Sequence, residues 1–181
     1  VKTSNLKADA GFVIMEPEDN PPMSGSNSIC VSTVLLEKNF LKMHYPLTQL
    51  SLEAPGGTIK VIAECEDNKV KSVSISNLPS FIDKLEVELS TKKYGKIIVS
   101  TAYGGDSFLL CNAKDFNLKI IPENAKLFVN IAREILKEAN DQIGFQHPTI
   151  PNLNYISFCQ FMEPIYTNEK GEKIAKNTVV I

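Results

Sequence analysis

The chain has 181 residues, 43% of them hydrophobic, and a formal net charge of -2. A chain of this length and composition buries a substantial core, so a globular fold of one domain or two small ones is expected. The 19 Lys and Arg residues nearly balance the 21 Asp and Glu residues and form no blocks, which argues against nucleic acid or a membrane as a partner. The opening residues VKTSNLKADAGF lack a targeting pattern, and no run approaches the roughly 18 apolar residues of a membrane span. The expected compartment is therefore the cytoplasm.

Four isolated cysteines and two histidines give no metal-binding pattern. Each cysteine stands among apolar residues without a CxxC partner, which predicts reduced thiols in the core. Neither His44 nor His147 has a second ligand candidate three or four residues away, so both are expected to be solvated loop residues. We therefore expect no metal site. The cysteines are Cys30, Cys65, Cys111 and Cys159.

The first part of the chain mixes short strands with one apolar segment. GFVIME (11–16) predicts a strand, and EPEDNPP (16–22) a loop. From Ser24 to Glu37 the sequence begins with small polar residues and is then apolar on almost every side, which predicts a helix over 25–37 that is buried all round. A strand is the rival interpretation, because the segment is rich in β-branched residues. The polar start favours the helix, since Ser and Asn are good cap residues.

Strand patterns dominate the middle of the chain. Segments 58–65 and 69–75 flank a three-residue turn, which predicts a hairpin, and further strands are expected over 85–89, 96–102 and 107–113. Pro79 and the polar stretch STKKYG place a boundary near residue 90, so the expected domains are 1–90, with the central helix and hairpin, and 91–181.

The second half contains the clearest helix pattern. Apolar residues spaced by three and four over 122–140 predict an amphipathic helix that ends near Gly144. Its apolar stripe is expected to pack in the core rather than to form a partner groove. Strands are expected at YISFCQF (155–161) and NTVVI (177–181), with a turn at 168–171 between them.

The most suggestive site is the loop Pro21–Met23 and the head of the helix that follows it. A helix start presents free N–H groups and the positive end of the dipole, so a carboxylate or phosphate is a suitable ligand. Gly25 lets a ligand approach the backbone, and Ser24, Ser26 and Asn27 are polar. The alternative is a polar cap on a buried helix, without a ligand.

Several segments, in order, resemble the proline racemase family: PPMSGSNSICVSTVLLE, LSLEAPGGTIKVIAEC, KVKSVSISNLPSF, STAYGGDSF, PENAKLFVNIAREI, HPTIPNLNYISF and KNTVVI. The resemblance implies an α/β, pseudo-symmetric diaminopimelate epimerase-like fold, with two β-rich shells around central helices. It also implies an enzyme that removes the α-proton of a proline or hydroxyproline with two acid/base residues, one from each half. No cofactor is implied. The implied partner is a small imino acid, and family members often pair as homodimers.

The resemblance assigns roles to the residues at the helix head. Ser24 takes the first acid/base position, where many members have Cys, and Ser26 stands where they often have His. Gly25 and Ser26, supported by Asn27, are implied to bind the substrate. A hydroxyl is a poor proton acceptor, so two-base racemisation of proline is less favoured. Ser occurs at this position in a subgroup resembling trans-3-hydroxy-L-proline dehydratases and some 4-hydroxyproline epimerases, and these are the expected activities.

Two further points concern the substrate and the second half of the site. Phe158 lies near a position where 4-hydroxyproline epimerases often have His, and an apolar side chain would not hold a 4-OH group. The family's second acid/base residue belongs to an Asp-Arg-Ser-Pro-Cys-Gly-Thr-Gly type motif after the strand that NTVVI resembles, and no cysteine of this chain has that context. If these 181 residues were the entire protein, we would expect no activity.

Two alternatives therefore remain beside the active enzyme. One is a non-catalytic remnant of the fold that binds an imino acid or acts as an interaction module. The other is an isomerase of the wider superfamily that acts on another small carboxylate.

Overall fold

The computed structural model describes residues 1–16 and 20–181, which form two compact units, Val1–Pro79 and Ser80–Ile181. The loop expected over 16–22 falls partly on residues 17–19, which lie outside the described residues. Each unit has its own hydrophobic core, one built around Leu52 and Ile59 and the other around Phe161.

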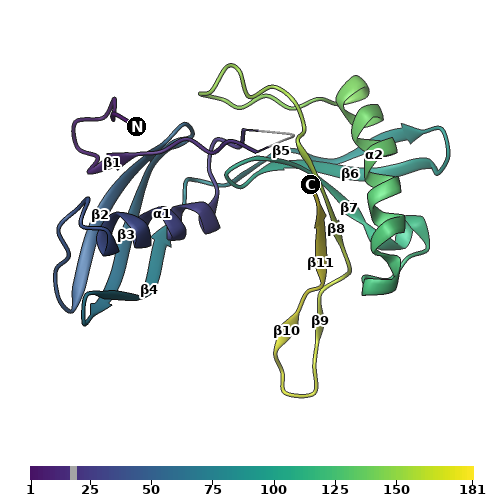
Figure 1. Cartoon of the computed structure of the whole chain (residues 1–181). Coiled ribbons are helices and arrows are strands. Elements are labelled where there is room, and N and C mark those ends of the chain that lie inside the picture. Colours follow the sequence, from purple (N-terminus) through teal and green to yellow (C-terminus); the bar gives the residue numbers. More distant parts are fainter. Residues whose placement is uncertain (17–19) are drawn as a thin grey trace. The chain divides into compact units, whose positions relative to one another are not determined.

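The first unit contains a four-stranded sheet and one helix (Figure 1). In chain order its elements are β1 (Ala10–Gly11), α1 (Gly25–Glu37), β2 (Leu47–Ala54), β3 (Gly57–Glu66) and β4 (Lys69–Ser76). The strand order is β1-β2-β3-β4, with β1 and β2 parallel and the other neighbours antiparallel. Helix α1 packs against β3 and β4. β3 buries every second residue, as expected of a strand with one face in the core.

Helix α1 covers the predicted range, but the expectation that it is buried all round is wrong for the described residues. Ser28, Ser32 and Leu36 are fully buried, whereas Ile29 is 39% exposed and Val34 52%. The physical reason is that the sheet covers only one face of the helix. The serines suit that face because each bonds to the helix itself: Ser28 Oγ donates to Ser24 O and Ser32 Oγ to Ser28 O, both at 2.7 Å.

The second unit is a five-stranded sheet with a helix on one face (Figure 1). Its elements are β5 (Phe81–Thr91), β6 (Gly95–Tyr103), β7 (Ser107–Asn112), α2 (Ala125–Gln142), β8 (Phe158–Met162), β9 (Tyr166–Thr167), β10 (Lys173–Ile174) and β11 (Asn177–Val180), with 3-10 turns at Ala113–Phe116 and Pro122–Asn124. The order is β11-β8-β7-β6-β5. Only β7 and β8 pair in parallel, and the crossover that joins them carries α2. β9 and β10 form a separate two-stranded hairpin.

The apolar stripe of α2 packs in the core, as predicted. Its buried residues contact the sheet, and the ring of Phe128 lies 4.7 Å from that of Phe161, measured between centroids. Gly144 follows the helix with a φ of 63°, and its N–H donates to Ala139 O at 2.9 Å, so it ends the helix as expected. The buried stripe consists of Phe128, Ile131, Ala132, Ile135 and Ala139.

Three features differ from the sequence predictions. The division between units follows Pro79 rather than residue 90, because STKKYG is the turn of the β5–β6 hairpin, in which Thr91 pairs with Gly95. The strand expected over 11–16 is reduced to β1, since the segment leaves β2 after Phe12 N–H donates to Glu53 O. The sequence also gave no separate prediction for β2.

The cysteines are free thiols, and one of them departs from the predicted burial. Cys30 is exposed on α1, because it faces away from the sheet. Cys65, Cys111 and Cys159 are buried, and the sulfur atoms of the last two lie 3.9 Å apart. Burial, together with the hydrogen bond to Cys111, raises the pKa of the Cys159 thiol far above its ordinary value. Among the described helices none is both long and apolar enough to cross a membrane.

The packing of α2 generates a stability prediction. Ile135→Ala should lower the free energy of unfolding of the second unit by about 2–5 kcal/mol, because it removes a fully buried side chain and leaves a cavity. Leu127→Ala, on the exposed face of the same helix, is the matched control. It should change the free energy of unfolding by about 0.5 kcal/mol or less. Urea unfolding followed by circular dichroism measures both. Equal effects of the two substitutions would contradict the assigned orientation of the helix.

Candidate functional site

The start of α1 is organised by Ser24. This residue is half-buried and extended, with φ -140° and ψ 128°, and it caps the helix. Its Oγ accepts from Asn27 Nδ2 at 3.1 Å and, more weakly, from Asn27 N at 3.5 Å, and it lies 3.3 Å from Ser26 Oγ. The three polar residues predicted as a site are therefore in mutual contact.

The backbone beside Ser24 presents hydrogen-bond donors. Ser28 N–H donates to Ser24 O at 3.0 Å, which closes the first turn of the helix. Within the described parts of the chain, no acceptor is recorded for the N–H groups of Gly25 and Ser26. These two donors stand at the positive end of the dipole of a 13-residue helix, an arrangement that favours an anionic oxygen.

The segment EAPGG contacts the loop that leads into α1. Gly56 N–H donates to Pro22 O at 2.8 Å, and the adjacent Met23 is buried at 4% exposure. Gly57 has a φ of 142°, and a Cβ there would lie 3.0 Å from Leu78 Cδ2. A side chain at this turn would therefore be strained, and the end of the Leu78 side chain would have to shift slightly to make room for it. The two segments that carry the strongest family resemblance thus meet at the helix start.

Ser24 has no strong base as a neighbour in the part of the chain that the structure describes. The recorded partners of its Oγ are an amide and a hydroxyl, and none is an imidazole, a carboxylate or an ammonium group. A serine hydroxyl without such a partner stays protonated at neutral pH. It is suited to donate or accept a hydrogen bond, and less suited to abstract a proton from carbon.

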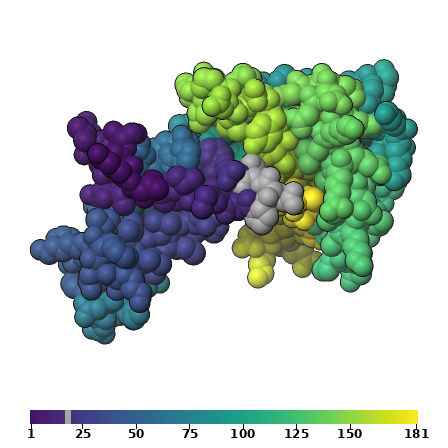
Figure 2. Space-filling view, turned by 45° about the horizontal axis from the view of Figure 1, so that its top comes forward, coloured from purple at the N-terminus to yellow at the C-terminus, as the bar shows by residue number. Residues whose placement is uncertain are grey.

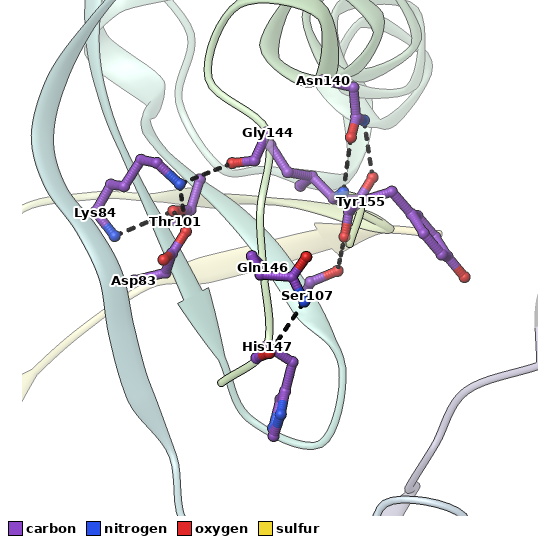
Figure 3. A network of polar contacts seen from close by, with 10 residues as sticks. Asp83, Lys84, Thr101, Ser107, Asn140, Gly144, Gln146, His147 and Tyr155 are labelled. Carbon is purple, nitrogen blue, oxygen red and sulfur yellow. Dashed lines mark hydrogen bonds and ion pairs between the residues drawn. The ribbon is translucent and has the colours of Figure 1, made fainter. Parts of the chain in front are cut away.

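A second polar network lies within the second unit, where β8 begins (Figure 3). Ser107 N and Ser157 Oγ each donate to Asp106 Oδ1 at 2.6 Å, and Ser107 Oγ donates to Tyr155 O at 2.7 Å. Asn140, near the end of α2, accepts from Ile156 N at 2.7 Å and donates to Ile156 O at 3.0 Å. The network fixes the backbone that enters β8. Asp106 directly follows the Gly-Gly turn after β6, and no local pattern in the sequence marks it as part of a network.

A lysine of the same unit ties the irregular strand β5 to the end of α2. Lys84 Nζ donates to Asp83 Oδ2 at 2.6 Å and to Gly144 O at 3.3 Å, and Thr101 Oγ1 donates to Asp83 Oδ2 at 3.0 Å (Figure 3). A cation near helix carbonyls is favoured by the helix dipole. This contact stabilises the backbone just before the segment that carries His147.

His147 lies in a loop, as predicted, but it is half-buried rather than solvated. Its Nδ1 accepts from the N–H groups of Thr149 and Ile150 at 3.2 and 3.1 Å, and its ring lies edge-on to Tyr103, with centroids 4.5 Å apart. The turn that it closes lies at the surface of the second unit (Figure 2). Burial lowers the pKa of His147, and burial and the charge of Asp106 raise the pKa of Tyr103. His44, in the first unit, is exposed as expected.

The described residues contain no group of three or more His, Cys, Asp or Glu side chains that could hold a metal ion. The donors at the start of α1 are N–H and hydroxyl groups, which bind anionic or neutral oxygens rather than cations.

A sequence profile of the family described as "Proline racemase" matches residues 1–181. The chain belongs to the proline racemase family. It is similar to the crystal structure of a probable proline racemase from Agrobacterium radiobacter K84 with bound carbonate, with a TM-score of 0.86 and 30% identity over 98% of this chain and 52% of that one. A hydroxyproline epimerase from Agrobacterium vitis with bound trans-4-OH-L-proline gives a TM-score of 0.85 and 32% identity over 98% and 50% of the two chains.

The fold extends to a more distant relative. Methylitaconate-delta-isomerase matches with a TM-score of 0.50 and 19% identity over 90% of this chain and 53% of its own, a likeness in fold alone. The α/β, diaminopimelate epimerase-like fold predicted from the resemblance is confirmed. The chain spans about half the length of the solved structures that it matches.

The contacts of His147 predict a pH dependence of stability. Its pKa in the folded state lies below the ordinary 6.5, so the unfolded state binds the proton more readily. The free energy of unfolding should therefore be highest above about pH 6.5 and fall as the pH is lowered through that value. His147→Asn replaces Nδ1 by an amide oxygen that still accepts the two N–H groups but does not titrate, so this part of the pH dependence should vanish.

Urea unfolding of both proteins measures this pH dependence of the free energy of unfolding. The range from about pH 5 to pH 8 is suitable because it is centred on the ordinary histidine pKa. Hydrogen exchange of the Thr149 and Ile150 amides gives the local readout, since these amides should lose protection at low pH only when His147 is present. If the free energy of unfolding depended on pH in the same way in the parent and in His147→Asn, the pH dependence would not come from His147.

Proposed function

We propose that the protein containing this chain abstracts the α-proton of a proline or hydroxyproline, with Ser24 in the first acid/base position and Gly25, Ser26 and Asn27 around the substrate. The observation that carries the proposal is the pair of N–H donors of Gly25 and Ser26, which stand beside the Ser24 hydroxyl and have no recorded acceptor among residues 1–16 and 20–181. Family membership supports the reaction class, and the contacts at the start of α1 support the roles proposed for these residues.

The difficulty of this reaction is the weak acidity of a C–H bond next to a carboxylate. When the α-proton leaves, negative charge moves onto the carboxylate oxygens. Two backbone N–H groups at a helix start are suited to bind the carboxylate and to stabilise the added charge, because they are fixed in place before the reaction. Asn27 holds Ser24 Oγ through its side chain, which keeps the hydroxyl at the edge of this donor pair.

Within this class we favour dehydration of trans-3-hydroxy-L-proline over epimerisation. Epimerisation needs a base on each side of the α-carbon, and among the described residues the recorded contacts of Ser24 are with an amide and a hydroxyl, neither of which would make it a base. In dehydration, one base removes the α-proton, the C–O bond to the 3-hydroxyl breaks, and that oxygen leaves as water after protonation. The resulting enamine rearranges to the cyclic imine Δ1-pyrroline-2-carboxylate. A hydroxyl at the position of Ser24 is sufficient to guide the departing 3-OH group.

Epimerisation of a hydroxyproline is the second candidate, because one of the similar structures is a hydroxyproline epimerase with bound trans-4-OH-L-proline. In either reaction the base is assigned to a residue outside this chain, at the position of the family's second motif. The substrate is a small imino acid, and the proposal uses no cofactor.

Substitution of Ser24 tests the proposal in the full-length protein. Ser24→Ala should lower kcat/KM for trans-3-hydroxy-L-proline by about 10²-fold or more, since it removes an acid/base group. Ser24→Asn should do the same although Asn is an equally good helix cap, which separates lost chemistry from a lost cap. Ser24→Cys supplies a group that ionises near neutral pH and should increase epimerisation relative to dehydration. The cyclic imine and the epimer are measured after chemical reduction and chiral separation.

Thr33→Ala is the matched control, because Thr33 Oγ1 donates to Ile29 O within the same helix but lies away from its start. This variant should retain the parent activity. Absence of turnover of trans-3-hydroxy-L-proline, proline and 4-hydroxyproline by the full-length parent would falsify the proposed reaction. Parent-like activity of Ser24→Ala would leave Ser24 without its assigned role.

A further inference from the structure

Strand β5 stands at one end of the five-stranded sheet, so one of its edges has no strand beside it among the described residues. An edge strand presents unpaired N–H and C=O groups, and a strand of another molecule can add to them. The pairing of β5 with β6 is irregular between Ile82 and Lys84 and again between Lys84 and Val87. Regular pairing, and with it an edge that another strand could join, is therefore confined to residues 87–91.

The irregular part of β5 turns its backbone donors towards β6. Lys84 N–H donates to Thr101 Oγ1 at 3.2 Å, and Glu86 N–H donates to Ser100 Oγ at 3.0 Å. Glu86 also has a left-handed φ of 50°. This part of the strand offers no regular row of groups to a partner.

The regular part of the edge is bonded to a side chain of α2 in the way it would be bonded to a strand. Gln142 Oε1 accepts from Ser90 N–H at 3.2 Å, and Gln142 Nε2 donates to Ser90 O at 2.9 Å. Two antiparallel residues exchange the same two bonds at a hydrogen-bonded position of a sheet. The backbone groups that Ser90 directs away from β6 are thus already used.

Two glutamates continue this contact along α2, which packs against β5 (Figure 1). Lys92 N–H donates to Glu138 Oε1 at 3.1 Å, and Lys93 Nζ lies 3.2 Å from Glu134 Oε1. Glu134, Glu138 and Gln142 are four residues apart, so they form one row on the helix surface. We call these three residues the α2 row. Because all three are exposed, hydrogen bonds and charge rather than burial hold their side chains at β5.

We propose that the α2 row acts as a substitute strand, which closes the β5 edge to strands of other copies of this chain. An added strand would have to displace Gln142 from Ser90 before it could pair there. A closed edge is no template, so the row prevents open-ended assembly strand by strand. The inference concerns contacts within the second unit and does not depend on the proposed reaction.

Hydrogen exchange in the full-length protein tests whether the row closes the edge. Gln142→Met keeps the length and helix propensity of the side chain but removes its amide, so the Ser90 amide should exchange about tenfold faster. Glu138→Met should have the same effect on the Lys92 amide. Glu138→Gln retains an acceptor oxygen and should leave the exchange of Lys92 as in the parent.

Self-association tests the consequence. Glu138→Met/Gln142→Met should form assemblies larger than the parent species at about tenfold lower protein concentration than the parent requires. Sedimentation velocity over a concentration series measures this. In the assemblies the Ser90 amide should regain protection from exchange, because another strand then occupies the edge.

Two controls separate an open edge from other causes of assembly. Lys137→Met adds an exposed methionine to the same helix outside the row, and it should behave like the parent. Ile135→Ala lowers the free energy of unfolding but leaves the row in place, so it should not assemble as the double variant does.

Unchanged exchange of Ser90 and Lys92 in the methionine variants would overturn the inference. So would a double variant that assembles only at the concentrations that the parent or Ile135→Ala requires. Assemblies in which the Ser90 amide stays unprotected would also overturn it, because the contact would then lie elsewhere.

Discussion

The candidate site depends on one backbone hydrogen bond, from Gly56 N–H to Pro22 O. This bond joins the turn between β2 and β3 to the loop that enters α1, and so fixes where the helix begins. Gly57 permits the turn because its φ of 142° is one that side chains of L-residues rarely adopt. Met23, the next residue of this loop after Pro22, is buried in the core of the first unit. N–H groups at a helix start are often left without a partner in the helix, but here the loop that enters the helix is bonded to the turn between β2 and β3, which limits the directions in which these groups can point.

The capped start of α1 could be predicted from the sequence because its residues are contiguous. Ser24 to Asn27 form one turn, and a polar turn before an apolar segment indicates a capped helix without long-range information. The hairpin of β3 and β4 was equally accessible, since a period of two around a short turn is a local signal. The boundary was misplaced because STKKYG has the composition of a linker although β5 and β6 pair on either side of it. Asp106, Asn140 and Ser157 are brought together by the crossover between β7 and β8, and local patterns carry no signal for such a network.

The two helices differ in how well hydrophobic periodicity predicts which face is buried. Helix α2 has an apolar face and a charged face, and its apolar face is buried. α1 has no such alternation, and the expectation of complete burial followed from hydrophobicity alone. The structure instead turns Ser28 and Ser32 to the sheet and leaves Ile29 and Val34 exposed. The hydroxyls of Ser28 and Ser32 bond to backbone oxygens of the helix itself, so both serines can lie on the face against β3 and β4 without an unsatisfied polar group.

The chemistry of Ser24 follows from the same local geometry. A thiol at a helix start becomes more acidic, because the dipole and the N–H groups stabilise the thiolate. The ordinary pKa of a serine hydroxyl is so high that a helix start does not ionise it at neutral pH. The hydrogen bonds with Asn27 and Ser26 involve neutral groups, so they do not change this. Under the proposed function, this position orients a substrate oxygen and does not hold a proton removed from carbon. A reaction that needs one base and one hydrogen-bonding group fits this arrangement better than a reaction that needs two bases, and for this reason we propose dehydration rather than epimerisation.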